Sequence, residues 1–325
     1  MIAIITVMIS FGMSFPLYQV HEEKAFISWM RSHNIVYTSD EYHIRLGIYL
    51  TNARYVQEHN SRNPSFKLSL NKFSTHTPTE YKAILGFNPK YENIRKVKFG
   101  KISNPETNID QLDWRDKGIV NDIKDQGKCG SCWAFSGVQC IESAWVLAGN
   151  PLERFSEQSV VDCTTSCGGC QGGGYYIAFV HIRSVQSGKL NPESEYPYTA
   201  TDGNDCEFSL HSKVGNLKNF YDVRYSNETD LAICCANYGP ACCSVDASHA
   251  SFQLYSSGIY DEPECSKTTL DHGVGLVGYG VENDVKYWIV RNSWGKAWGE
   301  EGYIRMLWDN NQCGLATRSM IVTVK

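Results

Sequence analysis

The chain has 325 residues, a formal net charge of −5 at pH 7 and a pI near 6.0. Its share of 42% apolar and 20% charged residues is typical of a globular protein, and the length exceeds one ordinary domain. Nucleic-acid binding needs clustered Lys and Arg, and no basic stripe occurs in the sequence, so nucleic acid is excluded as a partner.

The 13 cysteines are distributed unevenly. All lie between Cys129 and Cys313, and the first 128 residues contain none. This asymmetry predicts a disulfide-stabilised domain behind a separately built N-terminal region, in an oxidising compartment. The odd number leaves at least one thiol outside any intramolecular pair.

Residues 1–14 are apolar over a length too short to span a bilayer, and they end in small residues. We interpret this segment as a signal peptide; the alternative is a buried terminal segment. No later stretch has the apolar length of a transmembrane helix, so we expect no membrane span. The expected location is the secretory pathway, with a lysosome-like acidic compartment or the extracellular space as destination.

The segment 22–60 has the composition and apolar spacing of two amphipathic helices. On the second, six residues recur three or four positions apart and therefore share one side: Glu41, Arg45, Tyr49, Asn52, Val56 and Asn60. Taken alone, these residues describe an ordinary salt-bridged helix, with Glu41 and Arg45 as an i,i+4 pair.

The next segments predict a strand, a short helix and a linker. Residues 66–73 alternate as in a strand, and 77–80 can open a helix. Residues 88–108 contain Pro, Gly and many polar side chains without a period, which is typical of an extended linker. The end of this linker is a natural domain boundary and an accessible place for proteolysis.

A buried helix is predicted from Cys132 to Ala148, because its apolar residues lie mostly three or four apart and Gly149 follows. Cys132 falls in the first turn, where free N–H groups and the helix macrodipole favour an anion. We therefore expect this position to stabilise a thiolate.

The second half predicts antiparallel strands at 241–247, 272–280, 285–292 and 302–306, where short runs rich in Val, Ile, Tyr and Trp are broken by turn residues. Residues 281–285 predict a hairpin tip. A helical half joined to a β half leaves a cleft between them, a common place for a functional site.

The run Gln126-Gly-Lys-Cys-Gly-Ser-Cys-Trp-Ala-Phe135 resembles the sequence around the nucleophile of papain-like, cathepsin L-like cysteine proteases. The base of that family corresponds to His272, in Leu270-Asp-His-Gly-Val274, and its orienting amide corresponds to Asn292, in Asn292-Ser-Trp-Gly295. The resemblance implies an α+β, papain-like two-lobed fold. Its left lobe is helical, its right lobe is an antiparallel β-barrel-like structure, and a mainly helical prodomain precedes both.

The resemblance extends to the N-terminal region. The six-residue helix face is similar to the ERFNIN prosegment helix of the family, here 41–60, which replaces the ordinary-helix interpretation. Ser69 to Thr75 is similar to its Gly-x-Asn-x-Phe-x-Asp strand, but Ser69 and Thr75 stand where the family has Gly and Asp. If that Asp senses acid during activation, the pH trigger differs here. The implied domains are a signal peptide (1–14), an inhibitory propeptide (15–107) and a catalytic domain (108–325).

By resemblance, Cys132 is the nucleophile, His272 the general base and Asn292 the residue that orients the imidazole, with Trp294 shielding that hydrogen bond. The Gln126 side chain and the Cys132 backbone N–H form the oxyanion hole. The implied substrate-binding residues are Gly172, Gly173, Tyr175, Ser244, Leu270, Asp271, Gly273 and Arg318. Arg318 is unexpected at the base of an apolar P2 pocket, and we hypothesise that it favours an acidic P2 side chain; the alternative is that it points to solvent.

The family's disulfide pattern implies the pairs Cys129–Cys170, Cys163–Cys206 and Cys265–Cys313. On spacing alone, the two Cys-x-x-Cys pairs at 129–132 and 167–170 also suit a zinc ribbon or a redox site, but the resemblance disfavours both. An extra Cys140–Cys167 bridge is plausible. The pairing of Cys234, Cys235, Cys242 and Cys243 stays open, and Cys242 and Cys243 suit small buried strand residues.

The predicted function is a cysteine endopeptidase made as a zymogen, with polypeptide substrates and its own propeptide as inhibitor. No histidine-bearing insertion of the carboxydipeptidase kind occurs near the cleft glycines, which favours endopeptidase activity. We expect no cofactor and no metal, a monomer, cystatin-type inhibitors as partners, and glycosylation at Asn227 in an Asn-x-Thr sequon. The alternative is a catalytically idle, disulfide-rich binding protein on the same fold.

Overall fold

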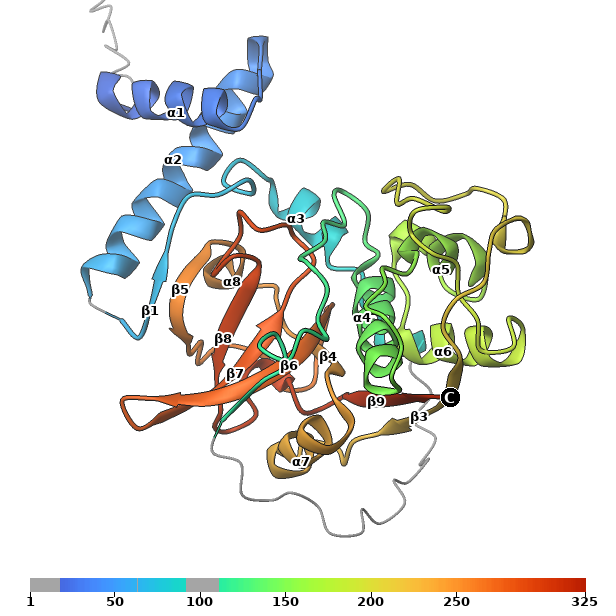
Figure 1. Ribbon diagram of the computed structural model, residues 1–325. Coiled ribbons are helices and arrows are strands. Elements are labelled where there is room, and N and C mark those ends of the chain that lie inside the picture. Colours follow the sequence, from blue (N-terminus) through green and yellow to red (C-terminus); the bar gives the residue numbers. More distant parts are fainter. Residues whose placement is uncertain (1–17, 63, 92–110) are drawn as a thin grey trace, which may run out of the picture.

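The computed structural model describes residues 18–62, 64–91 and 111–325 (Figure 1). The predicted signal peptide and the predicted start of the catalytic domain near Asn108 lie outside these residues. Among the described residues, no helix is both long and apolar enough to cross a membrane.

The two predicted N-terminal helices are confirmed as α1 (Val20–Ser32) and α2 (Ser39–Ser61), joined by a short turn. Figure 1 shows them at one end of the molecule, against the side that carries β1 and β5. Their interface is aromatic: the ring of Phe26 is fully buried and lies 5.1 to 6.3 Å from the rings of Trp29, Tyr37, Tyr42 and Tyr49.

The predicted strand 66–73 is too long. β1 covers only Phe66–Leu68, because the chain turns at Asn71, whose side-chain oxygen accepts a hydrogen bond from the backbone N–H of Phe73 (2.9 Å). The predicted helix opening at 77–80 is confirmed as α3 (Pro78–Ile84). Thr77 and Glu80 form a capping box at its N-terminus, with Pro78 in the first turn.

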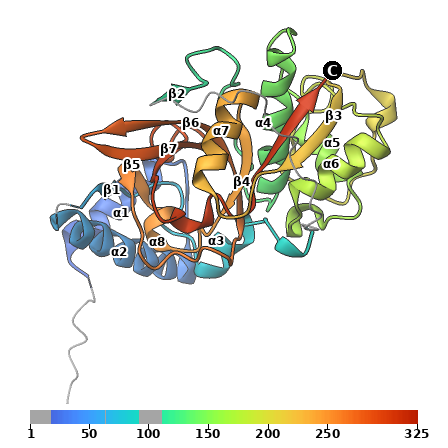
Figure 2. The ribbon, with the colours of Figure 1, turned by 90° about the horizontal axis from the view of Figure 1, so that it is seen from below.

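The rest of the chain forms two lobes that meet along α4 (Cys132–Leu147), the predicted buried helix (Figures 1 and 2). The helices on one side of α4 are α5 (Glu157–Cys163) and α6 (Tyr175–Ser184). The other side carries most of the sheet, together with α7 (Glu228–Tyr238) and α8 (Ala250–Gln253).

The strands form one curved sheet in the order β1-β5-β8-β7-β6-β4-β9-β3, with β2 paired to β6. Their bounds are β2 Leu112–Asp113, β3 Leu217–Asp222, β4 Ala241–Val245, β5 Tyr255–Tyr260, β6 His272–Glu282, β7 Val285–Arg291, β8 Tyr303–Leu307 and β9 Met320–Val324. Strand β1 of the N-terminal region therefore occupies one edge of the sheet, against β5.

The four predicted strands are β4, β6, β7 and β8, and the hairpin at 281–285 is confirmed. Its central residues Asn283 and Asp284 both have positive φ (51° and 63°), as a two-residue hairpin turn requires. The expectation of a wholly antiparallel β lobe is wrong at one place, because β5 and β8 pair in parallel. A parallel pair needs a long connection, and here β6 and β7 lie between them in sequence.

Strand β4 lies at the boundary between the cores of the two lobes. Because side chains alternate along a strand, Cys243 and Val245 belong to the core of the β lobe, whereas Cys242 belongs to the core around α4. Thus β4 is packed on both faces, and each face contributes to a different lobe.

We predict that Phe26→Ala will destabilise the helical N-terminal region by about 3–5 kcal/mol. The ring packs against four aromatic side chains, and its removal leaves a cavity among them. Thermal unfolding of the zymogen, with Cys132→Ala to prevent self-cleavage, measures the loss. Val36→Ala is the matched control, since Val36 is 83% exposed. Equal shifts for both variants would contradict this account of the interface.

Candidate active site

Cys132 is the first residue of α4 and is fully buried. Its sulfur accepts a hydrogen bond from the backbone N–H of Gly273 (3.3 Å), which follows His272 at the start of β6. A Cβ at Gly273 would lie 3.0 Å from the carbonyl oxygen of Cys132, so the close approach of β6 to α4 needs glycine at this position. The two lobes thus meet at the thiol.

His272 is fully buried and held by two partners from the segment that follows β7. Its Nε2 lies 2.8 Å from Oδ1 of Asn292, and its ring stacks on Trp294 with centroids 4.6 Å apart. An amide oxygen only accepts, so Nε2 carries the proton of the neutral ring. Nδ1 is then the nitrogen that can take a proton, and it has no hydrogen-bond partner among the described residues.

The side chain of Gln126 is fixed at both ends. Its Oε1 accepts a hydrogen bond from the Ser293 hydroxyl (2.6 Å), and its Nε2 donates to the carbonyl of Cys129 (2.8 Å). Nε2 also donates to the carbonyl of Ile84, the last residue of α3 (2.8 Å). An N-terminal segment therefore places a peptide carbonyl on the amide that is expected to bind an oxyanion.

The residues after Ile84 cross the cleft as an extended chain. Gly173 donates its N–H to Gly86 O and accepts from Asn88 N at its own carbonyl, both at 2.9 Å. The N–H of Phe87 donates to Asp271 O at 2.9 Å, and Phe87 forms a parallel bridge with Gly173. Both sides of the cleft thus bind this segment through main-chain hydrogen bonds.

Glycines make this close passage feasible. A Cβ at Gly86 would lie 1.7 Å from Gly130 O, and one at Gly172 would lie 2.7 Å from Gly86 O. A Cβ at Gly173 would collide with the Trp133 ring at 2.6 Å. The sequence-predicted cleft glycines, Gly172 and Gly173, therefore lie beside the segment that fills the cleft.

The side chain of Phe87 is buried among apolar residues of the catalytic domain. It is 3% exposed, its ring stacks on Tyr175 with centroids 5.3 Å apart, and Leu270 belongs to the same core cluster. The carbonyl of Arg318 accepts hydrogen bonds from the hydroxyls of Tyr175, in a short contact, and Ser244 (3.4 Å). Of the sequence-predicted pocket residues, Tyr175 stacks on this ring and Leu270 shares its core cluster, whereas Ser244 and Arg318 are linked to Tyr175 through the Arg318 carbonyl.

Burial sets the protonation of the two central groups. It raises the pKa of Cys132 to about 12, although hydrogen bonds from the Gly273 and Gly86 backbone act in the opposite direction. It lowers the pKa of His272 to about 4, against the smaller opposite effect of the Asn292 hydrogen bond. The expectation of a thiolate at Cys132 does not hold for this covered state, because burial favours the neutral thiol and the neutral imidazole.

Three disulfides are present: Cys129–Cys170, Cys163–Cys206 and Cys265–Cys313. These are the pairs that the family resemblance implies. The first uses two of the four sulfurs that a Cys₄ zinc site would need. The suggested Cys140–Cys167 bridge is wrong, because Cys140 lies instead against Cys242 on β4, and the Cys167 sulfur faces Gly174 O.

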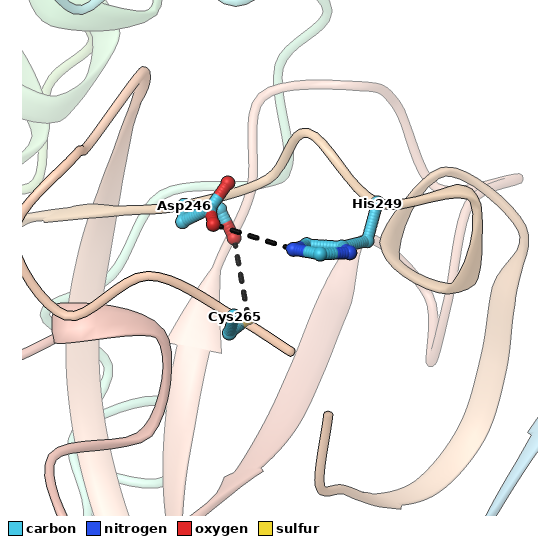
Figure 3. A group of neighbouring side chains, drawn as sticks. All are labelled: Asp246, His249 and Cys265. Carbon is cyan, nitrogen blue, oxygen red and sulfur yellow. Dashed lines mark hydrogen bonds and ion pairs between the residues drawn. The ribbon is translucent and has the colours of Figure 1, made fainter. Parts of the chain in front are cut away.

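One further cluster has the composition of a metal site. Asp246, His249 and Cys265 place their ligand-type atoms within 4.8 Å of one another (Figure 3). The Cys265 sulfur, however, is bonded to Cys313 and cannot be a thiolate. Asp246 instead accepts hydrogen bonds from Ser248 and Ser266, so the cluster braces two loops.

Sequence reasoning missed two sets of functional residues. Ser293, which fixes Gln126, stood inside the Asn292-Ser-Trp-Gly295 motif but received no role. Ile84, Gly86 and Phe87 lie between the predicted helix opening at 77–80 and the predicted linker at 88–108, and no role was predicted for them.

Comparisons with known proteins agree with this geometry. Residues 109–323 match the papain family cysteine protease domain, and residues 26–81 match the cathepsin propeptide inhibitor domain. Procathepsin L of Rattus norvegicus is 40% identical over 305 residues, covering 89% of this chain and 88% of the relative. Cathepsin L of Sarcophaga peregrina is 39% identical over 299 residues, covering 87% of each chain.

Solved structures are similar over the same length. Digestive procathepsin L 3 of Tenebrio molitor superposes with a TM-score of 0.83 at 31% identity, covering 94% of this chain and all of that one. A recombinant stem bromelain precursor superposes with a TM-score of 0.83 at 33% identity, covering 94% of this chain and 99% of that one. Because the family domain matches most of the chain and the inhibitor domain precedes it, this chain belongs to the papain family of cysteine proteases and is a zymogen of a cysteine-type endopeptidase.

Proposed function

We propose that Cys132 and His272 carry out the peptide hydrolysis of this endopeptidase. The observation that supports this most strongly is the His272–Asn292 hydrogen bond, which leaves Nδ1 as the proton acceptor beside the segment that binds Cys132. The thiol gives its proton to Nδ1, and the sulfur attacks the substrate carbonyl. The imidazolium then protonates the leaving amine, and water, activated by the same ring, releases the acyl group from the sulfur.

Gln126 Nε2 and the Cys132 backbone N–H are the proposed oxyanion donors. Gln126 already donates to a peptide carbonyl, that of Ile84, which supports this assignment. Ser293 holds the amide so that Nε2, and not Oε1, faces the cleft. A fixed donor of this kind stabilises charge without reorganising during the reaction.

The proposed processing follows from the domain arrangement. A signal peptide (1–14) directs the chain to the secretory pathway, and cleavage near Asn108 separates the propeptide (15–107) from the catalytic domain (108–325). The mature enzyme is a monomer in an acidic lysosome-like compartment or outside the cell, open to cystatin-type inhibitors. Asn227 is the proposed glycan site; its side-chain oxygen caps α7 by accepting from Asp230 N (2.8 Å), which leaves the amide nitrogen for the sugar.

The idle binding protein is the weaker alternative. Such a protein on this fold would lack the thiol, the imidazole or the amide that orients it. This chain has all three, and the hydrogen bond between the last two is formed.

We predict that the processed enzyme will cleave a dipeptidyl fluorogenic substrate at acid pH and that a thiol-trapping epoxide will abolish turnover. Gln126→Ala should lower kcat by roughly 10²–10³, because one oxyanion donor is lost. Lys128→Ala is the matched control, since Lys128 is an exposed residue of the same loop. No turnover with intact Cys132 after propeptide removal would defeat the assignment.

We further propose that His272 contributes to acid-dependent release of the propeptide. Thr75, which replaces the family's Asp, is buried, carries no charge and hydrogen-bonds to the Tyr37 hydroxyl (2.9 Å). Because burial lowers the pKa of His272 from 6.5 to about 4, its neutral form stabilises the covered state fully above pH 6.5. This contribution is lost as the pH falls toward 4.

Two carboxyl groups also affect the stability of the covered state, but with a different sign or in a different pH range from His272. Burial raises the pKa of Asp271 to about 7, so Asp271 favours the covered state as the pH falls, opposite to His272. The Arg45 guanidinium lowers the pKa of Glu80 to about 2, so the Glu80–Arg45 pair weakens only as the pH falls below about 4.5. His272 is therefore the proposed main source of release between pH 6.5 and 4, and His76 of the N-terminal region, whose pKa burial also lowers, contributes with the same sign.

We predict that hydrogen exchange of residues 84–91, corrected for intrinsic rates, will speed up between pH 6.5 and 4 in the Cys132→Ala zymogen. Adding His272→Gln should flatten this pH dependence, whereas adding Asp271→Asn should steepen it. An unchanged slope in the His272→Gln variant would contradict the proposed role.

The P2 pocket is the proposed site of substrate selection. The Nε of Arg318 is buried without a hydrogen-bond partner among the described residues. Asp222 is a carboxyl near Arg318. Burial raises the pKa of Asp222 to about 6, although the positive charge of Arg318 acts in the opposite direction. A half-buried guanidinium whose Nε has no partner among the described residues, with a carboxyl nearby that resists ionisation, supports recognition of an acidic P2 side chain.

We predict that Arg318→Ala will lower the turnover ratio of Glu-P2 to Leu-P2 substrates by roughly 10-fold or more, the value of a charge-assisted hydrogen bond. Asp222→Asn, which removes the competing carboxylate, should raise the same ratio. Equal ratios in the wild type and Arg318→Ala would refute the hypothesis.

A further inference from the structure

Seven cysteines lie outside the three disulfides, and two of them meet inside the protein. Cys140 lies on α4 and Cys242 on β4, and their side chains are 1% and 0% exposed. Their sulfur atoms are 2.7 Å apart. Non-bonded carbon atoms already touch at about 3.5–4.0 Å, and sulfur is larger, so this separation is too short for two thiols in contact.

We propose that Cys140 and Cys242 form a fourth disulfide. A disulfide joins sulfurs at about 2.05 Å, and the backbone here already holds the two side chains face to face. Cys242 points out of β4 toward α4, whereas its neighbour Cys243 points into the core of the β lobe. The alternation of the strand therefore selects Cys242, and not Cys243, as the partner.

A glycine on the neighbouring strand makes room for this contact. Cys242 pairs with Gly275 of β6, and a Cβ at Gly275 would lie 1.7 Å from the side chain of Gln139, which precedes Cys140. The absence of that Cβ lets α4 lie directly on the sheet. Helix and strand are thus close enough for a bond between their side chains.

The bond would join the two lobes beneath the active site. Cys140 lies about two helical turns after Cys132 on the same helix. Val245 on β4 pairs with His272 on β6. The disulfide would therefore connect the helix that carries the thiol to the strand beside the one that carries the imidazole.

The chemistry requires an oxidant of the disulfide class, such as oxidised glutathione or a disulfide oxidoreductase of the secretory pathway. One thiolate attacks the external disulfide and releases one thiol, and the second thiolate attacks the mixed disulfide and releases the other. Two protein thiols are oxidised and one external disulfide is reduced to two thiols. Since both sulfurs are buried in the folded chain, the exchange belongs to folding.

The test counts thiols in the full chain, secreted from an oxidising host with Cys132→Ser to prevent self-cleavage. Six cysteines then lie outside the three disulfides, and the proposed bond leaves four for alkylation in denaturant without reductant. Mass spectrometry counts the adducts, and a pepsin digest of the same protein should contain a peptide with residue 140 linked to one with residue 242. Six adducts without this linked peptide would overturn the proposal, whether or not any further variant folds.

Single substitutions then assign the partners. Cys140→Ser and Cys242→Ser should each raise the count by one adduct, because each releases the other sulfur. Cys243→Ser, the adjacent and equally buried control, should lower it by one. A rise with Cys243→Ser in place of Cys242→Ser would assign the bond to the neighbouring residue and overturn the proposal.

Discussion

The hydrogen bond between His272 Nε2 and Asn292 Oδ1 links the first residue of β6 to the segment after β7, and it determines which ring nitrogen can act as a base. A carboxylate in place of the amide would neutralise the imidazolium that, in the proposed mechanism, stabilises a thiolate. Trp294 is 1% exposed and stacks on the His272 ring, which is the arrangement expected of a residue that shields this bond from water. The antiparallel pairing of β6 and β7 therefore brings the imidazole and the amide within hydrogen-bonding distance, in addition to building the sheet.

The N-terminal region acts on this arrangement from two sides. Phe73 packs edge-on against Trp294 with ring centroids 5.0 Å apart, outside the His272–Asn292 bond. The carbonyl of Ile84 accepts a hydrogen bond from the Gln126 side-chain amide within the cleft. The same covering that blocks access also removes water, and this desolvation favours the neutral forms of Cys132 and His272. The N-terminal region therefore both fills the site and favours the neutral forms of its thiol and imidazole.

The sequence allowed the two helices within 22–60, the helix at Cys132 and the four strands of the central sheet to be predicted, because each has a clear apolar period or a turn signal. Local motifs also pointed to Gln126, Cys132, His272 and Asn292 as the candidate site, and the structure links them through hydrogen bonds of Asn292 to His272, of Gly273 to Cys132 and of Ser293 to Gln126. The sequence could not predict the parallel pairing of β5 with β8 or the path of Ile84 to Asn88, since both depend on contacts between distant segments. The Cys140–Cys242 contact was missed for the same reason, as the two residues lie 102 positions apart.

Strand β1 completes the sheet in the zymogen only, because it belongs to the N-terminal region and pairs with β5. Its departure converts β5 from an interior strand into an edge strand with unpaired backbone groups, the kind of surface on which chains aggregate. Two features of β5 oppose this. Gly258, with φ of 92°, interrupts the extended backbone, and the register of β1 on β5 is irregular between Lys67 and Leu68. A strand of this shape is a poor template for pairing with a second chain once β1 has left.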